Sequence, residues 1–170
     1  DEFMMNDNKK TILKDSNDVS MHCKWRSVES SLNATRRVVN LGKKHNRHIH
    51  VLHITTAVEM DFLRDNKDIA TVEVIPNHLT MHAPECYEEL GTLAQQNPPI
   101  REKEHQDALW RAIDDGTVDI VASDHAPHTL EEKSGVYPST PSGTPGVQTL
   151  LPIMLDHAAN GKLSYERIVD

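Results

Sequence analysis

The sequence predicts an α/β protein built on a parallel sheet, and three observations support this class. Short segments rich in apolar and β-compatible residues recur at 48–53, 69–75 and 118–122. Segments with helical periodicity or helix-capping residues lie between them, which is typical of βα units. Polar side chains follow the first and third segments, at the strand ends where parallel α/β proteins place their active sites. Strand periodicity alone does not distinguish an open sheet from a barrel.

The first part of the chain is expected to contain two helices. Residues 1–24 are polar and show no clear period, so loop or frayed helix is expected there. A helix is expected over 27–44, because Ser27 can cap it and an apolar stripe runs along one face. A second helix is expected directly after the first strand, because Thr56 and Glu59 have the spacing of a capping box.

The later elements continue this alternation of strands and helices. Pro76 closes the second strand. The other expected elements are a long connection (77–101), a helix (102–115), a loop rich in Pro, Gly, Ser and Thr (134–146), a helix of about 148–160, and a helix from Ser164 to Asp170.

Composition narrows the class of function. The formal net charge of −8 argues against a partner such as nucleic acid or an anionic membrane, which attracts basic surfaces. No apolar run approaches the roughly 18 residues that a membrane span needs, and the first residues lack a signal-peptide pattern. The two cysteines do not form a disulfide framework, so a reduced, cytoplasmic location is expected.

Two groups of residues at strand ends have the composition of a metal site. The chain contains 11 histidines, and histidine is the commonest metal ligand. His53 follows the first strand, and Asp124, His125 and His128 follow the third. Neutral imidazoles and carboxylates are suitable ligands for Zn²⁺. His53 alone is compatible with a hydrogen-bonded structural histidine as well, whereas the cluster after the third strand favours a site.

The other histidines are not expected to take part in a site. His48 and His50 have the opposite strand parity from His53, so they are expected to face a covering helix or solvent. The histidines in loops or on helices are expected to be solvated: His22, His45, His82, His105 and His157.

Four segments resemble motifs of the dihydroorotases, in the class related to the multifunctional eukaryotic enzyme. Residues 123–133 (SDHAPHTLEEK) are similar to the signature of this family. Residues 97–101 (NPPIR), 51–56 (VLHITT) and 143–152 (GTPGVQTLLP) resemble three further motifs, in the family's order and at about its spacing. The resemblance covers nearly the whole chain.

The resemblance implies a fold and a reaction. The family consists of metal-dependent cyclic amidohydrolases with a (β/α)₈ barrel, which interconvert N-carbamoyl-L-aspartate and L-dihydroorotate in pyrimidine synthesis. By this resemblance, His53 ligates one of two zinc ions. Asp124 ligates the other and acts as the general acid and base, taking a proton from the metal-bound hydroxide and delivering it to the leaving ring nitrogen.

The resemblance also implies which residues hold the substrate. Asn97 and His128 are expected to bind it, His128 through the substrate carboxylate. The backbone at Ser142 and Gly143 is expected to contact the substrate ring or its amide, within a substrate-side loop at 134–146. A glycine suits such a close approach.

The matching segment corresponds to the last three βα units of the barrel. The family's His-x-His-x-Arg motif and its bridging carboxylate have no counterpart here, and the fifth-strand histidine would fall just before Asp1. A TIM barrel typically needs about 250 residues, so residues 1–170 are expected to form a partial barrel domain without its N-terminal half. Alone, such a unit exposes two sheet edges and is expected to be unstable or to associate.

Several interpretations of the function remain open. The chain is part of a longer enzyme, a fragment completed by another chain, or a non-catalytic dihydroorotase-like subunit that binds aspartate carbamoyltransferase. Another cyclic amidohydrolase, such as an allantoinase or a hydantoinase, is the alternative activity. The full-length protein is expected to be a homo-oligomer.

Overall fold

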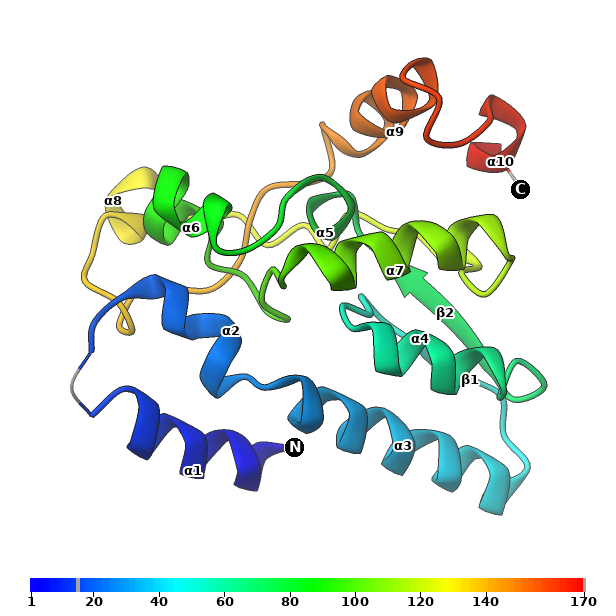
Figure 1. The fold of residues 1–170 in the computed structure, drawn as a ribbon, viewed down its shortest axis with the longest axis horizontal. Helices are drawn as coiled ribbons and strands as arrows, with labels where there is room; N and C mark the ends of the chain where they lie inside the picture. Colours follow the sequence, from blue (N-terminus) through cyan, green and yellow to red (C-terminus); the bar gives the residue numbers. More distant parts are fainter. Residues whose placement is uncertain (15, 170) are drawn as a thin grey trace.

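The computed structural model describes residues 1–14 and 16–169 and confirms the α/β class (Figure 1). Its sheet has three parallel strands in the order β1-β2-β3: β1 (Ile49–Val51), β2 (Ala70–Val74) and β3 (Ile120–Val121). Ile49 pairs with Ala70, and Glu73 pairs with Ile120. The three strands therefore present their carboxyl ends at one edge of the sheet. Within the described residues, β1 and β3 each have one unpaired side.

Two of the predicted helices lie between strands, and the caps expected at Ser27 and Thr56 are present. The Ser27 side chain accepts a hydrogen bond from the Ser30 amide, and the Thr56 side chain accepts one from the Glu59 amide. The helices that follow the prediction are α3 (Val28–His45), α4 (Ala57–Arg64), α7 (Lys103–Asp114), α9 (Leu150–Ala159) and α10 (Tyr165–Val169). Asp170, the expected end of the last helix, lies outside the described residues.

The first 25 residues are more regular than expected. They form α1 (Glu2–Ile12), the 3-10 helix η1 (Val19–Met21) and α2 (His22–Trp25), and α1 lies beside α2 and α3 (Figure 1). Asp1 caps α1 through its side chain, which accepts a hydrogen bond from the Met4 amide at 3.2 Å. No side chain of α1 is buried, so this helix has no apolar stripe by which the sequence could reveal it.

One face of the sheet carries the main core. Ala70, Val72 and Val74 of β2 are fully buried on this face. They pack with side chains from α3, α4, α7 and α9, among them Val39, Leu63, Leu109 and Met154. Burying such side chains contributes about 1.5–3 kcal/mol each. This core fixes the sheet and thereby the strand ends that carry the candidate site.

The long connection expected at 77–101 is partly helical. It contains α5 (Pro76–Thr80), α6 (Glu85–Leu90) and the 3-10 helix η2 (Gly91–Ala94), and a further short helix, α8 (Leu130–Lys133), precedes the loop at 134–146. A second apolar cluster lies beneath these segments: Val19, Cys23, Ala83, Cys86, Tyr87, Ala94, Ile100 and Tyr137.

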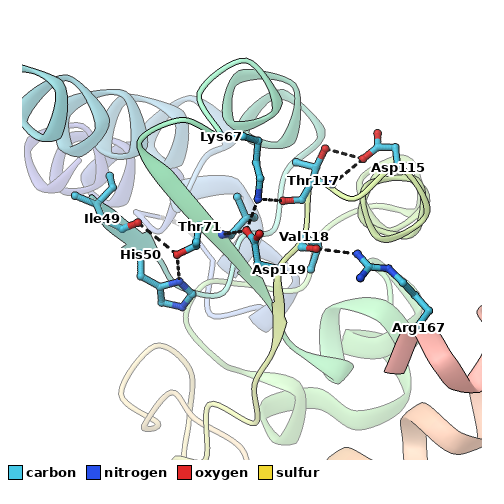
Figure 2. Close-up of polar contacts among 10 residues, drawn as sticks. Ile49, His50, Lys67, Thr71, Asp115, Thr117, Val118, Asp119 and Arg167 are labelled. Atoms are coloured by element: carbon cyan, nitrogen blue, oxygen red, sulfur yellow. Dashed lines mark hydrogen bonds and ion pairs between the residues drawn. The ribbon is translucent and has the colours of Figure 1, made fainter. Parts of the chain in front are cut away.

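The other face of the sheet is more polar and partly open. His50 Nδ1 lies 2.8 Å from Thr71 Oγ1 on this side (Figure 2). Leu52 and Ile120, which follow the same parity, are 53% and 45% exposed. None of the described helices is long and apolar enough to cross a membrane.

Side-chain contacts anchor the start of β3. The Asp119 carboxylate accepts a hydrogen bond from the Val72 amide at 2.7 Å and forms an ion pair with Lys67. Arg167 of α10 donates to the Val118 carbonyl at 3.0 Å, as Figure 2 shows. These contacts hold the short third strand beside β2.

Candidate active site at the carboxyl ends of the strands

The two residues expected to bind metal share an unusual backbone conformation. His53 follows β1 with φ 37°, and Asp124 follows β3 with φ 42°. Among the described residues, the only other non-glycine residue with positive φ is Asn46, which ends α3. Left-handed backbone at an ordinary residue costs about 1–3 kcal/mol and is concentrated at functional sites. Both strand ends therefore carry the strain that is typical of an active site.

His53 lies on the wall of an open cavity. Its backbone amide donates to Glu73 Oε1 at 3.2 Å, and Glu73 Oε2 lies 3.1 Å from His50 Nε2. The cavity has a volume of about 520 Å³, and its lining includes both His53 and Asn97. The structure thus brings one predicted metal ligand and one predicted substrate residue to the same space. His50 is exposed on the open side of the sheet, which is one of the two positions expected for it.

The motif at 97–101 divides into an exposed and a buried part. Asn97 is exposed, whereas Arg101 is only 3% exposed. The Arg101 guanidinium donates to the carbonyls of Cys23 at 3.0 Å and Arg26 at 2.6 Å. It also donates to the Ser31 hydroxyl at 3.0 Å. Arg101 therefore anchors the turn that presents Asn97.

The other predicted substrate residues lie together. The Gly143 amide donates to the Gln95 carbonyl at 3.0 Å, and Ser142 Oγ accepts from Gln95 Nε2 at 3.0 Å. Gly143 has φ 146°, and a Cβ placed there would lie 2.5 Å from the Ala126 carbonyl oxygen and 3.3 Å from His128 Cδ2. Only glycine allows this close approach between the loop and the segment that carries His128.

Lys133 holds the same loop through hydrogen bonds to its backbone, and the sequence analysis did not predict this role. It is 4% exposed, and its ammonium donates to the carbonyls of Gln95 at 2.8 Å, Pro141 at 3.1 Å and Gly143 at 3.1 Å. Burial lowers its pKa. Because an ammonium has three N–H groups, these carbonyls use all of its donors.

The described part of the chain does not form a complete metal site. His53 and Asp124 follow the two outer strands, with β2 between them. Within residues 1–14 and 16–169, no group of three His, Cys, Asp or Glu side chains is arranged to hold a metal ion. Imidazole and carboxylate are nevertheless donors that zinc prefers. The chain therefore supplies two donors of suitable chemistry and needs further ligands to complete a site.

Two histidines near the site are buried, and the sequence analysis missed both. His22, expected to be solvated, is 1% exposed, and burial lowers its pKa to about 4. His78 follows β2 at the same sheet edge, and burial lowers its pKa to about 3. Its Nε2 lies 3.0 Å from the Pro98 carbonyl. Because His78 closely follows a strand in the sequence, its place near the site could have been predicted from the sequence. His105, also expected to be solvated, is buried and accepts a hydrogen bond from the Ala57 amide.

Comparison of the sequence with known proteins identifies dihydroorotases. No family model matches the chain. It is 38% identical over 160 residues to a protein from Halobacterium salinarum named dihydroorotase, which covers 94% of this chain and 37% of that protein. A Bacillus subtilis protein of the same name is 38% identical over 151 residues, which covers 85% of this chain and 34% of that protein. The chain thus spans about a third of the length of these relatives.

Solved structures with a similar fold include hydantoinases and a dihydropyrimidinase. An L-hydantoinase from Arthrobacter aurescens matches with a TM-score of 0.90 at 25% identity, over 98% of this chain and 39% of that one. A dihydropyrimidinase from Brevibacillus agri matches with a TM-score of 0.88 at 24% identity, over 99% of this chain and 39% of that one. An inactive dihydroorotase-like domain of a multifunctional protein from Chaetomium thermophilum matches at 0.58 and 21% identity, over 77% of this chain and 36% of that one.

These matches confirm the fold that the motifs predict. The three βα units correspond to part of an amidohydrolase TIM barrel. In such a barrel the face of the sheet that carries His50 and Leu52 is directed inward, and the carboxyl ends of the strands form the active-site rim. His53 and Asp124 both lie on that rim.

Proposed function

We propose that this chain, which belongs to the dihydroorotase family by its sequence, contributes part of the active site of a dihydroorotase. The reaction is the reversible cyclisation of N-carbamoyl-L-aspartate to L-dihydroorotate. The observation that carries the proposal is the position of His53 and Asp124, which lie in strained conformations at two strand ends of a sequence 38% identical to dihydroorotases. Asn97 and His128 follow in the positions that the family motifs assign to substrate binding.

The metal assignment is part of this proposal. His53 would hold one of two zinc ions and Asp124 the other, with the remaining ligands supplied from outside residues 1–170. Zinc bound there polarises the scissile carbonyl and lowers the pKa of a water molecule. Asp124 would hold a proton on its carboxylate and move it to the ring nitrogen that leaves.

The substrate contacts follow from the arrangement of the loop. His128 would bind the substrate carboxylate, and the backbone of Ser142 and Gly143 would contact the ring or its amide. The bonds from Gln95 and Lys133 support this role, because they hold the loop backbone at a fixed distance from His128. Asn97 would complete the binding surface from the cavity wall.

The proposal extends to the setting of the whole protein. Residues 1–170 would form a partial barrel domain, with 134–146 as its substrate-side loop. Cys23 and Cys86 are both free and buried, which agrees with a reduced, cytoplasmic environment. At full length we propose a homo-oligomer that is able to associate with aspartate carbamoyltransferase.

A hydantoinase activity is the second candidate, because the fold matches the L-hydantoinase more closely than the dihydroorotase-like domain. The Asn97-Pro-Pro motif and His128 favour dihydroorotase, since that family uses them for an acidic substrate. A non-catalytic subunit is the third candidate. The presence of His53, Asn97, Asp124 and His128 together argues against it.

Parallel assays of the protein at its natural length separate these candidates. We expect hydrolysis of L-dihydroorotate and its formation from N-carbamoyl-L-aspartate, with little turnover of hydantoin or allantoin. Asp124→Asn should lower kcat by about 100-fold or more, because the proton carrier is lost. Asp156→Asn, at an exposed aspartate of α9, is the matched control and should leave kcat unchanged. Faster turnover of hydantoin, or full activity of Asp124→Asn, would contradict the proposal.

Zinc content gives an independent measurement. We expect about two zinc ions per active site after dialysis of the protein at its natural length. Loss of zinc without loss of activity would count against the assignment of His53 and Asp124.

A further inference from the structure

A buried chain of hydrogen bonds links the substrate-side loop to Asn97. Trp25 Nε1 donates to the Tyr137 hydroxyl, and that oxygen lies 3.2 Å from His22 Nδ1. The other nitrogen of the same imidazole, Nε2, lies 2.9 Å from the Gln96 carbonyl and 3.0 Å from Asn97 Oδ1. The three aromatic residues are 7%, 2% and 1% exposed, in the order Trp25, Tyr137 and His22. The sequence separates His22 from Tyr137 by 115 positions, so only the fold brings them together.

Packing holds the three rings rigidly. The His22 ring meets the Trp25 ring edge to face, with centroids 5.7 Å apart and an angle of 82° between the planes. It meets the Tyr137 ring in the same way, at 5.7 Å and 86°. The imidazole is therefore fixed between two perpendicular rings and cannot turn without displacing them.

The chemistry of the end groups fixes the direction of each hydrogen bond. An indole nitrogen only donates, so the Tyr137 oxygen accepts from Trp25, and its single hydrogen is available to His22 Nδ1. A backbone carbonyl only accepts, so His22 Nε2 must carry the hydrogen that faces Gln96. Burial lowers the pKa of His22 to about 4, which keeps the ring neutral at pH 7. One tautomer, with the hydrogen on Nε2, satisfies every partner.

This tautomer sets the orientation of the Asn97 amide. An N–H at His22 Nε2 can face the oxygen of the amide but not its NH₂ group. The oxygen and nitrogen of an amide diverge from one carbon atom, so the nitrogen points away from His22. Asn97 is exposed and lines the cavity that it shares with His53, so two N–H donors are available on that side.

We propose that His22 and Tyr137 are positioning residues that fix the Asn97 amide with its NH₂ group directed to the substrate. The group recognised is an oxygen acceptor with no hydrogen of its own, either a carboxylate or a ring carbonyl of the substrate. The inference rests on the proposed function for the identity of that substrate. A reversed amide would present its oxygen to an acidic substrate and repel it.

Two variants at one position test this role. His22→Phe keeps a ring of similar size but removes the N–H that faces Asn97. His22→Gln restores an amide N–H near the place of Nε2. In the protein at its natural length, we expect His22→Phe to raise KM for L-dihydroorotate about tenfold with kcat within about threefold, the effect of one hydrogen bond. His22→Gln should return KM to within about threefold of wild type, as one restored donor requires.

His157 offers a matched control. It meets the Trp110 ring edge to face at 4.9 Å and lies 2.9 Å from the Thr80 hydroxyl, so it has the same kinds of contact away from the site. His157→Phe should leave KM unchanged. Equal KM values for wild type and a folded His22→Phe variant, or an equal rise in His157→Phe, would overturn the proposal.

A measurement independent of turnover uses ¹⁵N NMR of the histidine side chains at pH 7. We expect His22 to carry its proton on Nε2 and to remain neutral. A proton on Nδ1 would overturn the proposal even if the His22→Phe variant does not fold. A wild-type protein that leaves dihydroorotate unchanged would refute the proposed function, and the tautomer would still decide whether the Asn97 amide is fixed as inferred.

Discussion

Replacing Lys133 with methionine should loosen the substrate-side loop, and the size of the effect can be worked from its contacts. The ammonium donates to the carbonyls of Gln95, Pro141 and Gly143. The Gln95 carbonyl keeps a second partner, the Gly143 amide, when Lys133 is removed. The carbonyls of Pro141 and Gly143 would each lose their only protein partner among the described residues.

The cost follows from these two carbonyls. A buried acceptor left without a partner costs about 1.5 kcal/mol, in the lower half of the usual range, which gives about 3 kcal/mol for two. Removing the ammonium recovers about 1 kcal/mol of its desolvation, and methionine fills the apolar volume of the lysine stem. We therefore expect Lys133→Met to lower the free energy of unfolding by about 2 kcal/mol.

Urea unfolding of the wild-type and variant proteins at natural length measures this difference. The exposed Lys162 provides the control, and Lys162→Met should change the free energy by less than about 0.5 kcal/mol. The Lys133→Met variant should also show a higher KM, because Gly143 would no longer be held against the segment of His128. A Lys133→Met variant as stable as Lys162→Met would refute the assignment of Lys133 as the anchor of this loop.

Three further outcomes are expected. Between pH 8 and pH 5 the free energy of unfolding should fall by about 2 kcal/mol for each of His22 and His78. In the folded protein their pKa values of about 4 and 3 lie below the ordinary 6.5, so the unfolded chain binds protons in this range that the folded chain does not. Urea titrations that give the same stability at both pH values would contradict this. Gly143→Ala should lower kcat/KM about tenfold or more, because the new Cβ would lie 2.5 Å from the Ala126 carbonyl oxygen and force the loop to move; unchanged steady-state kinetics would show that the loop does not need this approach. Arg101→Lys should reduce stability by about 2 kcal/mol in urea, because lysine keeps the charge but not the fork that reaches two carbonyls and two hydroxyls; a smaller loss than about 0.5 kcal/mol would mean that charge alone suffices.

The sequence predicted those parts of the fold that depend on interactions between residues close together in the chain. Ser27 and Thr56 cap their helices through side-chain bonds to residues three positions away, so the sequence contains the whole interaction. In β2 the buried Ala70, Val72 and Val74 alternate with Thr71 and Glu73, which lie on the more polar face of the sheet, so the apolar residues follow the period of a strand. The predicted third strand is longer than β3 (Ile120–Val121), because Asp119 bonds to the Val72 amide with its side chain.

The sequence predicted the positions of the helices better than it predicted which of their residues are buried. Of the apolar residues on α3 and α4, Val39 is buried, whereas Val38, Leu41 and Val58 are 40%, 50% and 41% exposed. Polar side chains such as Thr35 occupy part of the buried face of α3. Their burial depends on hydrogen bonds across elements, here from Thr35 to the Glu59 carboxylate, and periodicity does not contain that information.

The sequence predicted that His53 and Asp124 lie at one sheet edge, because strand ends are recognisable from the chain alone, but it did not predict the network behind them. The burial of His22 depends on Tyr137 and Gln96, which are 115 and 74 positions away. Lys133 binds backbone carbonyls. Because every residue has such a carbonyl, the pattern of side chains does not show which ones a lysine will bind. Supporting residues of this kind become visible only when the chain is folded.

The arrangement of charge near the site leads to one more conclusion about substrate capture. The protein carries a net charge of −8, and the proposed substrate is itself an anion. The two buried cations beside the site, Lys133 and Arg101, direct their donors to backbone carbonyls and hydroxyls of the chain. They stabilise the loop and the turn, and Lys133 has no free donor to offer a ligand. Under the proposed function, an anionic substrate would therefore be attracted by His128, by bound metal, by Arg26, which lines the same cavity as Asn97, and by neutral donors that are held in one orientation. The Asn97 amide, fixed through His22, is such a donor, and this explains why a side chain without charge is supported by so much buried structure.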